Sequence, residues 1–383
     1  MDTAGVKKNG SAKKWVSIVG ARPQFVKLAP VCRAIEAHNR ETASPRIEHC
    51  IIHTGQHYDR EVAELLFLQM EIPEPNYNLA VGSGSHGTQL ARMLARLEPI
   101  LASKRPDWVV VYGDTNSTLA GALLAARLKL PVAHVEAGCR SVDGSTPEEQ
   151  NRILSDHLSR LLLAPSQSAM ENLHREGIGL ENDPKNRHTV LVGDVMYDAL
   201  LQNLPLAENY AEGSLRQFGL ESHEYYLLTL HRAENTDCAE RLHTILSAME
   251  TLELPVLFPV HPRTKDALAK MGVSPNGRLR PVPPLGYLEM LTLEKHARKI
   301  LTDSGGVQKE AFYAGIPCVT LRDRTEWPET VAFGANRIGG TTVESIREAV
   351  RADDQKEWTA ATPYGDGKAA QKIVREILAA DGH

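Results

Sequence analysis

The sequence predicts an α/β protein built from two doubly wound domains of similar topology. Residues 108–138 and 297–320 follow one plan: a buried strand, a turn with an aspartate, a helix of small residues, a proline break and a second strand. A chain of 383 residues also exceeds what one hydrophobic core usually supports. Two such βαβ units therefore predict two parallel sheets that face each other across a cleft, with ligands beyond the carboxyl ends of the strands.

The expected domain boundaries follow changes in composition. Residues 1–14 are polar and basic and are expected to form a flexible tail. The first domain is expected to span residues 15–186 and the second residues 187–367, with the most linker-like stretch at 179–190. An amphipathic helix at residues 368–383 is expected to cross back and join the first domain.

The composition argues against several classes of partner. The net charge is −5, so no overall basic field attracts nucleic acid or an anionic membrane. The apolar run from Trp15 to Val19 is too short for a signal sequence or a membrane span. The five cysteines are scattered, with no C-x-x-C pair, which favours a reducing compartment and makes the cytoplasm the expected location.

An anion site is predicted around Ser304. Residues 299–302 are expected to form a strand, 303–306 a tight turn and 307–314 a helix. The unpaired N–H groups and positive dipole end of that helix favour an anion, although Ser304 could also simply cap an ordinary helix. Glu310, one turn into the helix, is suited to ribose hydroxyl groups, which together with the anion site favours a nucleoside diphosphate.

Two cations follow the first predicted strand. Arg22 and Lys27 lie in the first βα loop and the first turn of the next helix, where a cation opposes the helix dipole. A solvated surface position therefore carries a small cost there, which a bound anion would relieve. His53 and His57 are four residues apart, but Gly55 and the strand context argue against one helix presenting both to a metal. No metal site is therefore predicted.

Acidic residues end two adjacent buried strands. Asp114 and Glu136 fall where ligands of a doubly wound sheet bind, so each needs a partner or a chemical task. The structural alternatives are an N-cap for Asp114 and a buried salt bridge for Glu136, for example to Arg140. Residues 147–152 open a helix with a proline and acids in its first turn, which accounts structurally for at least one glutamate there.

Histidines end two strands of the second domain. Residues 225–230 lead to His231, and residues 256–260 lead to His261, which is followed at two residues' distance by Arg263. An isolated histidine at a strand end is more often a capped surface residue than a catalyst. Here the strands converge on one sheet edge, which favours a shared site.

Eight segments together carry a family resemblance: GARPQ (20–24), TGQH (54–57), YGDT (112–115), HVEAG (134–138), PEE (147–149), HRAEN (231–235), HPR (261–263) and DSGG (303–306). They closely resemble the non-hydrolysing UDP-N-acetylglucosamine 2-epimerases over nearly the full chain. The resemblance implies the two-Rossmann-domain architecture called GT-B, a homodimer, and interconversion of UDP-N-acetylglucosamine (UDP-GlcNAc) with UDP-N-acetylmannosamine (UDP-ManNAc). No metal or nicotinamide cofactor is implied.

The resemblance also assigns residue roles. The implied catalytic residues are Asp114, Glu136, Glu148 and His231. The implied substrate-binding residues are Arg22, Lys27, Arg152, His261, Arg263, Ser304, Gly305, Gly306 and Glu310. Among them, Arg22, His231 and the turn at Ser304 would hold the diphosphate. Asp114 and Glu136 would exchange protons near the reacting carbons.

The chemistry of this family fits these groups. The C2 proton of the sugar is not acidified by an adjacent carbonyl, so direct abstraction would be very slow. Departure of UDP from C1 acidifies C2–H, and elimination gives 2-acetamidoglucal and UDP. Re-addition with protonation from the other face inverts C2. The route needs groups that stabilise the leaving UDP and carboxyls that exchange protons.

The sequence departs from the family at two positions and leaves other functions open. Cys139 replaces the leucine of Glu-Ala-Gly-Leu-Arg, and Asp59 stands where some bacterial members have a glutamine thought to help bind a second, activating UDP-GlcNAc. The nearest alternatives are a 2-epimerase of a UDP-diacetamido-uronic acid and a hydrolysing UDP-GlcNAc 2-epimerase. A glycosyltransferase shares the fold. A nucleotide-sugar sensor would not need Asp114, Glu136 and Glu148 together.

Overall fold

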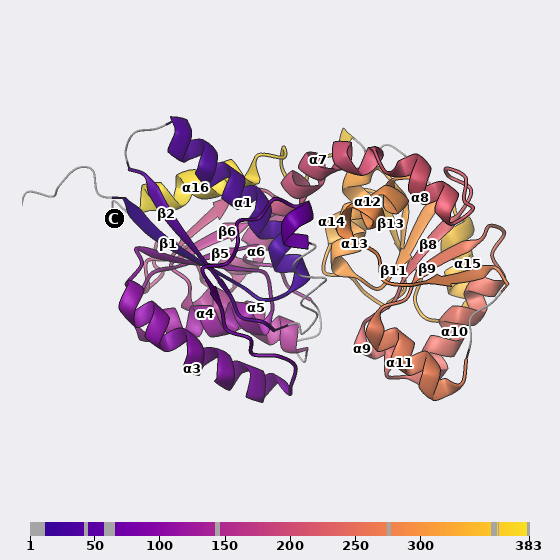
Figure 1. Ribbon diagram of the computed structural model, residues 1–383, viewed down its shortest axis with the longest axis horizontal. Coiled ribbons are helices and arrows are strands. Elements are labelled where there is room, and N and C mark those ends of the chain that lie inside the picture. Colours follow the sequence, from indigo (N-terminus) through magenta and orange to yellow (C-terminus); the bar gives the residue numbers. More distant parts are fainter. Residues whose placement is uncertain are drawn as a thin grey trace, which may run out of the picture. The chain divides into compact units, whose positions relative to one another are not determined.

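The computed structural model describes residues 12–41, 45–56, 66–141, 146–273, 277–353, 358 and 360–380. The chain divides into two compact units (Figure 1). Unit 1 comprises Met1–Ala199 and Tyr364–His383, and unit 2 comprises Leu200–Pro363. Each is an α/β domain built on a parallel sheet, which confirms the predicted fold class. The predictions at His57 and Asp59 fall outside the described residues.

Unit 1 is built on a 7-stranded sheet with the order β3-β2-β1-β4-β5-β6-β7. Its strands are β1 (Lys13–Val19), β2 (Ile47–His53), β3 (Tyr77–Asn78), β4 (Trp108–Tyr112), β5 (Val132–Val135), β6 (Leu161–Ala164) and β7 (His188–Leu191). The central strand β4 reads WVVVY and is buried along its whole length, as expected for a strand covered on both faces. The strand order reverses between β1 and β4, which is the topological switch point of the sheet.

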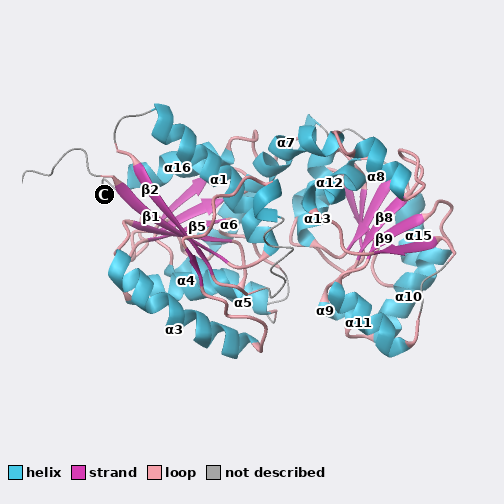
Figure 2. Ribbon diagram, in the orientation of Figure 1, coloured by secondary structure: helices cyan, strands magenta, loops and turns pink. Residues whose placement is uncertain are grey.

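Helices cover both faces of this sheet (Figure 2). On one face α1 (Arg22–Glu41) packs against α16 (Ala369–Ala380). On the other face α3 (His86–Lys104), α4 (Asn116–Arg127) and α5 (Pro147–Leu158) lie side by side, and α6 (Gln167–Arg175) packs near β6 and β7. The C-terminal helix α16 therefore belongs to unit 1.

The division between the units lies at different residues from those expected. Strand β7 pairs in parallel with β6, with Ala164 opposite Leu191, so it completes the first sheet instead of opening the second domain. The chain leaves unit 1 within α7 (Val195–Glu208), after Ala199, and returns at Tyr364. The side chains of β7 are exposed or half-buried, so its apolar pattern is too weak to assign it to either sheet from sequence.

Unit 2 is built on a 6-stranded sheet with the order β10-β9-β8-β11-β12-β13. Its strands are β8 (Tyr226–Thr229), β9 (Val256–Pro259), β10 (Leu279–Val282), β11 (Lys299–Thr302), β12 (Cys318–Thr320) and β13 (Asn336–Ile338). Its helices are α8 (Ala211–Gln217), α9 (Ala233–Thr236), α10 (Ala239–Glu250), α11 (Pro262–Met271), α12 (Tyr287–Lys295), α13 (Gly305–Ala314), α14 (Pro328–Ala332) and α15 (Val343–Arg351). The predicted repeat is confirmed, because β4-α4-β5 and β11-α13-β12 are both parallel βαβ units beside a switch point.

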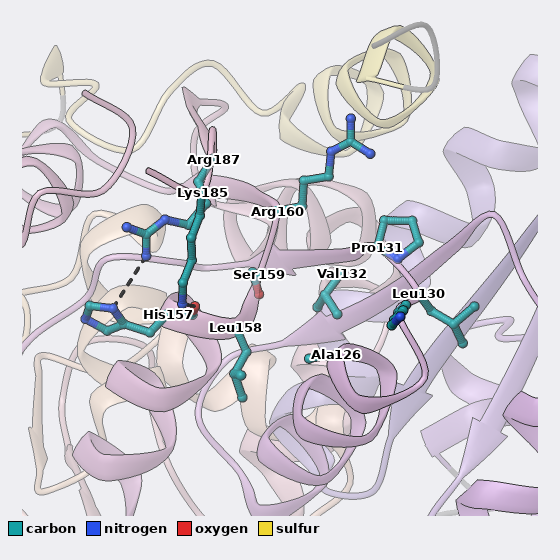
Figure 3. Close-up of a pocket in the computed structure, with 11 residues that line it drawn as sticks. Ala126, Leu130, Pro131, Val132, His157, Leu158, Ser159, Arg160, Lys185 and Arg187 are labelled. Atoms are coloured by element: carbon teal, nitrogen blue, oxygen red, sulfur yellow. Dashed lines mark hydrogen bonds between the residues drawn. The ribbon is translucent and has the colours of Figure 1, made fainter. Parts of the chain in front are cut away.

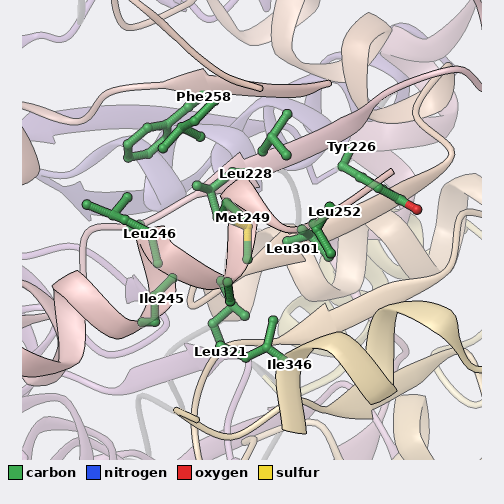
Figure 4. Close-up of a cluster of buried hydrophobic side chains, with 14 of the residues drawn as sticks. Tyr226, Leu228, Ile245, Leu246, Met249, Leu252, Phe258, Leu301, Leu321 and Ile346 are labelled. Carbon is green, nitrogen blue, oxygen red and sulfur yellow. The ribbon is translucent and has the colours of Figure 1, made fainter. Parts of the chain in front are cut away.

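The hydrophobic core of unit 2 fixes the strands that lead to its candidate site. Leu228 of β8, Phe258 of β9 and Leu301 of β11 pack with Ile245 and Met249 of α10 (Figure 4). Each fully buried side chain of this size contributes about 1.5–3 kcal/mol. This packing holds the carboxyl ends of β8, β9 and β11 side by side, as the pairing of β8 with both neighbours requires.

Candidate active site

Gln24 joins the first βα loop of unit 1 to the end of β4. Its Oε1 accepts a hydrogen bond from the N–H of Gly20 at 2.8 Å, and its Nε2 donates to the carbonyl of Tyr112 at 3.0 Å. A Cβ on Gly20 would lie 1.9 Å from Oγ1 of Thr54 and 2.3 Å from Oγ of Ser117, so only glycine fits there. These contacts explain structurally why the GARPQ segment begins with glycine and ends with glutamine.

Lys27 and Glu136 form a buried ion pair at the switch point. Nζ of Lys27 lies 2.7 Å from Oε1 of Glu136, and the two residues are 4% and 7% exposed. A Cβ on Gly113 would lie 2.9 Å from that Nζ and 3.4 Å from that Oε1. The turn that carries Asp114 therefore lies against the pair, and three of the predicted site residues come together at one sheet edge.

The suggested partner of Glu136 was wrong. Arg140 instead lies 2.8 Å from Oδ2 of Asp156 and 2.6 Å from Oε1 of Glu176. Lys27, 109 residues away in sequence, takes the place beside Glu136. The backbone of Glu136 has φ +70°, a left-handed conformation that residues with side chains rarely adopt and that neighbouring contacts must maintain.

Arg152 holds Asp114 from helix α5. Its Nη2 lies 2.5 Å from Oδ2 of Asp114, and its Nη1 lies 3.0 Å from Oε2 of Glu149. Arg152 is 5% exposed, so both ion pairs are largely shielded from water. The N-cap of α4 is Thr115 and not Asp114, which excludes the capping alternative for that carboxylate. Asp114 is held from one side and keeps a partly exposed carboxylate.

Two further predicted residues of unit 1 are less constrained. Glu148 is half-buried in the first turn of α5, whereas its neighbour Glu149 is buried and accepts the N–H of Ser141 at 3.0 Å. Glu149 is thus the glutamate with the structural role. Arg22 is half-buried at the first residue of α1, and within the described ranges its guanidinium has no hydrogen-bond or ion-pair partner. Both side chains are available to a ligand.

Asp303 organises the loop of unit 2 that carries His231. Its fully buried carboxylate accepts hydrogen bonds from the backbone N–H of His231 at 3.1 Å and of Arg232 at 3.0 Å. The amide of Asn235 also donates to Oδ2 of Asp303, at 3.0 Å. Sequence reasoning placed Asp303 in a turn but missed this role, because the contact joins the ends of β8 and β11.

His231 and His261 lie at neighbouring strand ends, with ring centroids 5.4 Å apart. Nδ1 of His231 faces Asp303 at 3.4 Å, so the opposite ring nitrogen is left for a ligand. Burial lowers the pKa of His231, whereas the charge of Asp303 acts in the opposite direction. His261 caps α11 by accepting the N–H of Arg263, whose guanidinium pairs with Asp237 at 2.9 Å.

Helix α13 begins two residues earlier than expected, at Gly305. Ser304 caps it by accepting the N–H of Val307, and both glycines belong to the first helical turn. Capping leaves other first-turn N–H groups unpaired, which is the arrangement that binds phosphate. Glu310 lies on the same helix and is 8% exposed.

Arg232 is a further basic residue beside this turn, in addition to His231, and it was not among the predicted site residues. A Cβ on Gly305 would lie 3.7 Å from Nη2 of Arg232. That Nη2 lies 3.8 Å from Oε1 of Glu326, and Glu326 in turn pairs with Arg322 at 2.9 Å. The HRAEN segment therefore brings an arginine as well as a histidine to the start of α13. Arg232, the second residue of this segment, is the residue from which this cation could have been predicted.

A separate cavity of about 360 Å³ lies at the opposite edge of the unit 1 sheet, where β5 and β6 begin (Figure 3). Three of its basic side chains already have partners. Lys185 donates to the carbonyl of His157 at 3.2 Å, Arg187 pairs with Asp183 at 2.8 Å, and Arg160 lies over the ring of Trp108. These contacts account for three of the positive charges of the cavity without a bound anion.

Among the described residues, no group of three or more histidine, cysteine, aspartate or glutamate side chains could hold a metal ion. The same ranges contain no helix with the length and apolar character needed to cross a membrane.

Known proteins resemble this chain in sequence and in structure. A family model described as UDP-N-acetylglucosamine 2-epimerase matches residues 39–378. A protein of Methanococcus maripaludis named UDP-N-acetylglucosamine 2-epimerase homolog is 48% identical, covering 95% of this chain and 99% of its own length. The UDP-2,3-diacetamido-2,3-dideoxy-D-glucuronate 2-epimerase of Pseudomonas aeruginosa is 42% identical, with coverage of 95% and 99%. A crystal structure of Methanocaldococcus jannaschii UDP-GlcNAc 2-epimerase in complex with UDP-GlcNAc and UDP has a TM-score of 0.86 at 44% identity, with coverage of 96% and 99%.

Proposed function

The chain belongs to the UDP-N-acetylglucosamine 2-epimerase family, and from this premise we propose that it interconverts UDP-GlcNAc and UDP-ManNAc without hydrolysis. The observation that carries the proposal is the edge of the unit 1 sheet, where Asp114 lies beside the Lys27–Glu136 ion pair. Carboxylates at the edge of the sheet where ligands bind are suited to exchange a proton with the carbon of a bound sugar.

The reaction begins with cleavage of the bond between C1 and the UDP oxygen, which leaves with the bonding electrons. A carboxylate removes the C2 proton, and the C–H electrons form the double bond of 2-acetamidoglucal. Return of a proton to the opposite face of C2, with re-addition of UDP at C1, gives the epimer. We assign these proton transfers to Asp114 and Glu136, with Glu148 as a further acid or base.

Unit 2 supplies the groups that hold UDP in this proposal. The first turn of α13, at Ser304, Gly305 and Gly306, binds the phosphates together with His231, while Glu310 binds the ribose. Negative charge grows on the phosphates as the C1–O bond breaks, and N–H groups and cations stabilise it more in the transition state than in the bound substrate. From unit 1 we assign Arg22 to the same phosphates, because its guanidinium has no hydrogen-bond or ion-pair partner among the described residues.

The contacts of three assigned residues change one assignment and leave two in place. Arg152 acts through Asp114, because its guanidinium already engages Asp114 and Glu149. His261 and Arg263 remain proposed substrate-binding residues, although one caps α11 and the other pairs with Asp237. A homodimer and a cytoplasmic location remain part of the proposal, and light scattering of the purified protein tests the first.

Proton NMR of the purified protein with UDP-GlcNAc in D₂O tests the activity. The expected result is UDP-ManNAc that carries deuterium at C2, because the C2 proton is lost to solvent-exchanging carboxyls. Release of free N-acetylmannosamine and UDP would identify a hydrolysing epimerase and contradict the proposal.

A second candidate is a 2-epimerase of UDP-2,3-diacetamido-2,3-dideoxy-D-glucuronate, favoured by the 42% identity to the Pseudomonas aeruginosa enzyme. The same NMR experiment with that nucleotide sugar distinguishes the two. Turnover of the uronate with no turnover of UDP-GlcNAc would replace the first proposal by the second.

A further inference from the structure

His134 is fully buried in β5, and its ring contacts the turn that precedes Asp114. Its Nε2 lies 2.7 Å from the carbonyl oxygen of Gly113, and its Nδ1 lies 2.6 Å from Oδ1 of Asp156. The carbonyl oxygen of Gly113 can only accept, so Nε2 carries the hydrogen of that bond. The ring of His134 thus links the Gly113 turn to the buried carboxyl group of Asp156.

Asp156 uses its second oxygen on the turn that follows Glu136. Its Oδ2 accepts the N–H of Gly138 at 3.1 Å and lies 2.8 Å from Nη1 of Arg140. Burial alone would raise the pKa of Asp156, but the charges of His134 and Arg140 outweigh burial and lower it. One fully buried carboxylate thus reaches both catalytic turns of unit 1, one directly and one through His134.

The Glu136 turn contains a backbone conformation that needs support from its surroundings. Glu136 has φ +70° despite its side chain, whereas Gly113 (φ +62°) and Gly138 (φ +81°) adopt such angles readily. A residue with a side chain in this conformation persists when surrounding contacts fix it. The Lys27–Glu136 ion pair holds the side chain of Glu136, but it leaves the backbone on either side to other groups.

We propose that His134 and Asp156 are positioning residues that hold the Asp114 turn and the Glu136 turn in one fixed arrangement, so that both carboxylates are set for proton exchange at C2. The inference rests on the proposed function and adds two residues that lie outside the assigned site. Both side chains are 0% exposed, so neither touches the substrate. They act through the Gly113 carbonyl and the Gly138 N–H.

Paired substitutions separate the two links. In His134→Asn the amide takes the place of Nδ1 and keeps the contact with Asp156, but it loses Gly113. In His134→Gln the amide reaches the place of Nε2 and keeps the bond to Gly113. Similarly, Asp156→Ala loses every contact, whereas Asp156→Asn donates to Nδ1 of a neutral His134 and still accepts the N–H of Gly138.

The expected result for His134→Asn and Asp156→Ala is a kcat about 100-fold lower, since small displacements of catalytic groups have effects of this size. KM and the UDP dissociation constant stay unchanged. The rescuing variants His134→Gln and Asp156→Asn recover to within about tenfold of wild type. His157→Asn, next to Asp156 on α5 but paired with Glu176 at 3.3 Å, keeps wild-type kcat and is the matched control.

The outcomes are distinguishable. Wild-type activity in His134→Asn, or equal losses in His134→Asn and His134→Gln, would overturn the inference while the proposed function stands. If UDP affinity falls together with kcat, His134 and Asp156 support the folded structure in general and do not specifically position the two carboxylates. If His134→Asn does not fold, Asp156→Asn is compared with wild type instead. This variant keeps the shape of the side chain and the hydrogen bonds to His134 and Gly138. A kcat about 100-fold below wild type in folded Asp156→Asn would contradict positioning by hydrogen bonds. If wild type turns over neither nucleotide sugar, the proposed function fails and this inference fails with it.

Discussion

At Asp114 the negative charge can be removed with little change in the shape of the side chain. Asp114→Asn keeps the shape of the side chain and leaves Arg152 paired with Glu149. We expect kcat to fall by about 10² to 10⁴-fold, the usual contribution of one acid or base, because the amide cannot exchange a proton with C2. UDP binding measured by calorimetry stays unchanged, since the proposal assigns UDP chiefly to α13.

The control for Asp114 is Asp107, at the amino end of β4. Asp107 is exposed and accepts the backbone N–H of Lys14. Asp107→Asn is expected to keep wild-type kcat. If Asp114→Asn loses UDP affinity as well as kcat, Asp114 is a binding residue and the proposed proton transfer is wrong.

His231 predicts a pH dependence of UDP binding. Burial lowers the pKa of its ring in the free protein, so the ring is neutral near pH 7. Phosphate oxygens at the first turn of α13 favour the charged ring and raise its pKa in the complex. UDP binding therefore takes up a proton, and between the two pKa values the dissociation constant rises up to about tenfold per pH unit.

Calorimetry in two buffers with different ionisation enthalpies measures the proton uptake at pH 7 to 8. His231→Gln is the control variant, because it cannot take up the proton. A binding enthalpy that is the same in both buffers for wild type would mean that His231 does not change its charge when UDP binds.

At the scale of elements, Asp198 joins α7 to the start of α16. Its carboxylate accepts the N–H groups of Ala369 at 3.1 Å and Ala370 at 2.8 Å. Burial raises the pKa of Asp198 to about 6, although these two hydrogen bonds act in the opposite direction. The folded protein binds the proton more tightly than the unfolded chain, so the stability from Asp198 is full below pH about 4 and is lost as pH rises through 6.

The size of that effect follows from the pKa shift. A shift of two units corresponds to about 2 to 3 kcal/mol. The unfolding free energy of Asp198→Asn minus that of wild type is therefore expected to rise by this amount between pH 4 and 7, measured by urea unfolding at each pH. The subtraction removes the effect of every other titrating group. A difference that does not change with pH would show that Asp198 keeps an ordinary pKa.

The elements that a local pattern encodes were predictable, and the contacts between them were not. The two βαβ units were found because an apolar strand, a turn and a small-residue helix are written in consecutive residues. The partner of Glu136 was missed because Lys27 lies on helix α1, 109 residues away in sequence. Asp303 could be placed at a strand end from sequence, but that its carboxylate binds the backbone of His231 depends on β8 and β11 being neighbours.

At the scale of the whole molecule, the limits of unit 1 illustrate the same point. The edge strand β7 carries no apolar pattern that distinguishes the first sheet from the second, and only its pairing with β6 assigns it. The C-terminal helix was predictable as an element because Ile373, Val374 and Ile377 lie on one face, and all three are buried in unit 1. Periodicity thus predicts that a face is buried, whereas the residue at which the chain passes between units depends on tertiary pairing.

The proposed division of labour predicts different amide hydrogen-exchange patterns for two ligands. UDP at 100 times its dissociation constant stabilises the residues that bind it by about 2.7 kcal/mol, so amides of residues 231–235 and 303–310 should exchange more slowly. UDP-GlcNAc bound to the inactive Asp114→Asn full chain should extend this protection to residues 113–116 and 136–140, because the sugar is assigned to the carboxylates of unit 1. Uridine, which lacks the phosphates, is the control and should protect residues 303–310 least. Protection by UDP-GlcNAc that stays within unit 2 would contradict the assignment of Asp114 and Glu136 to the sugar, whatever the overall activity.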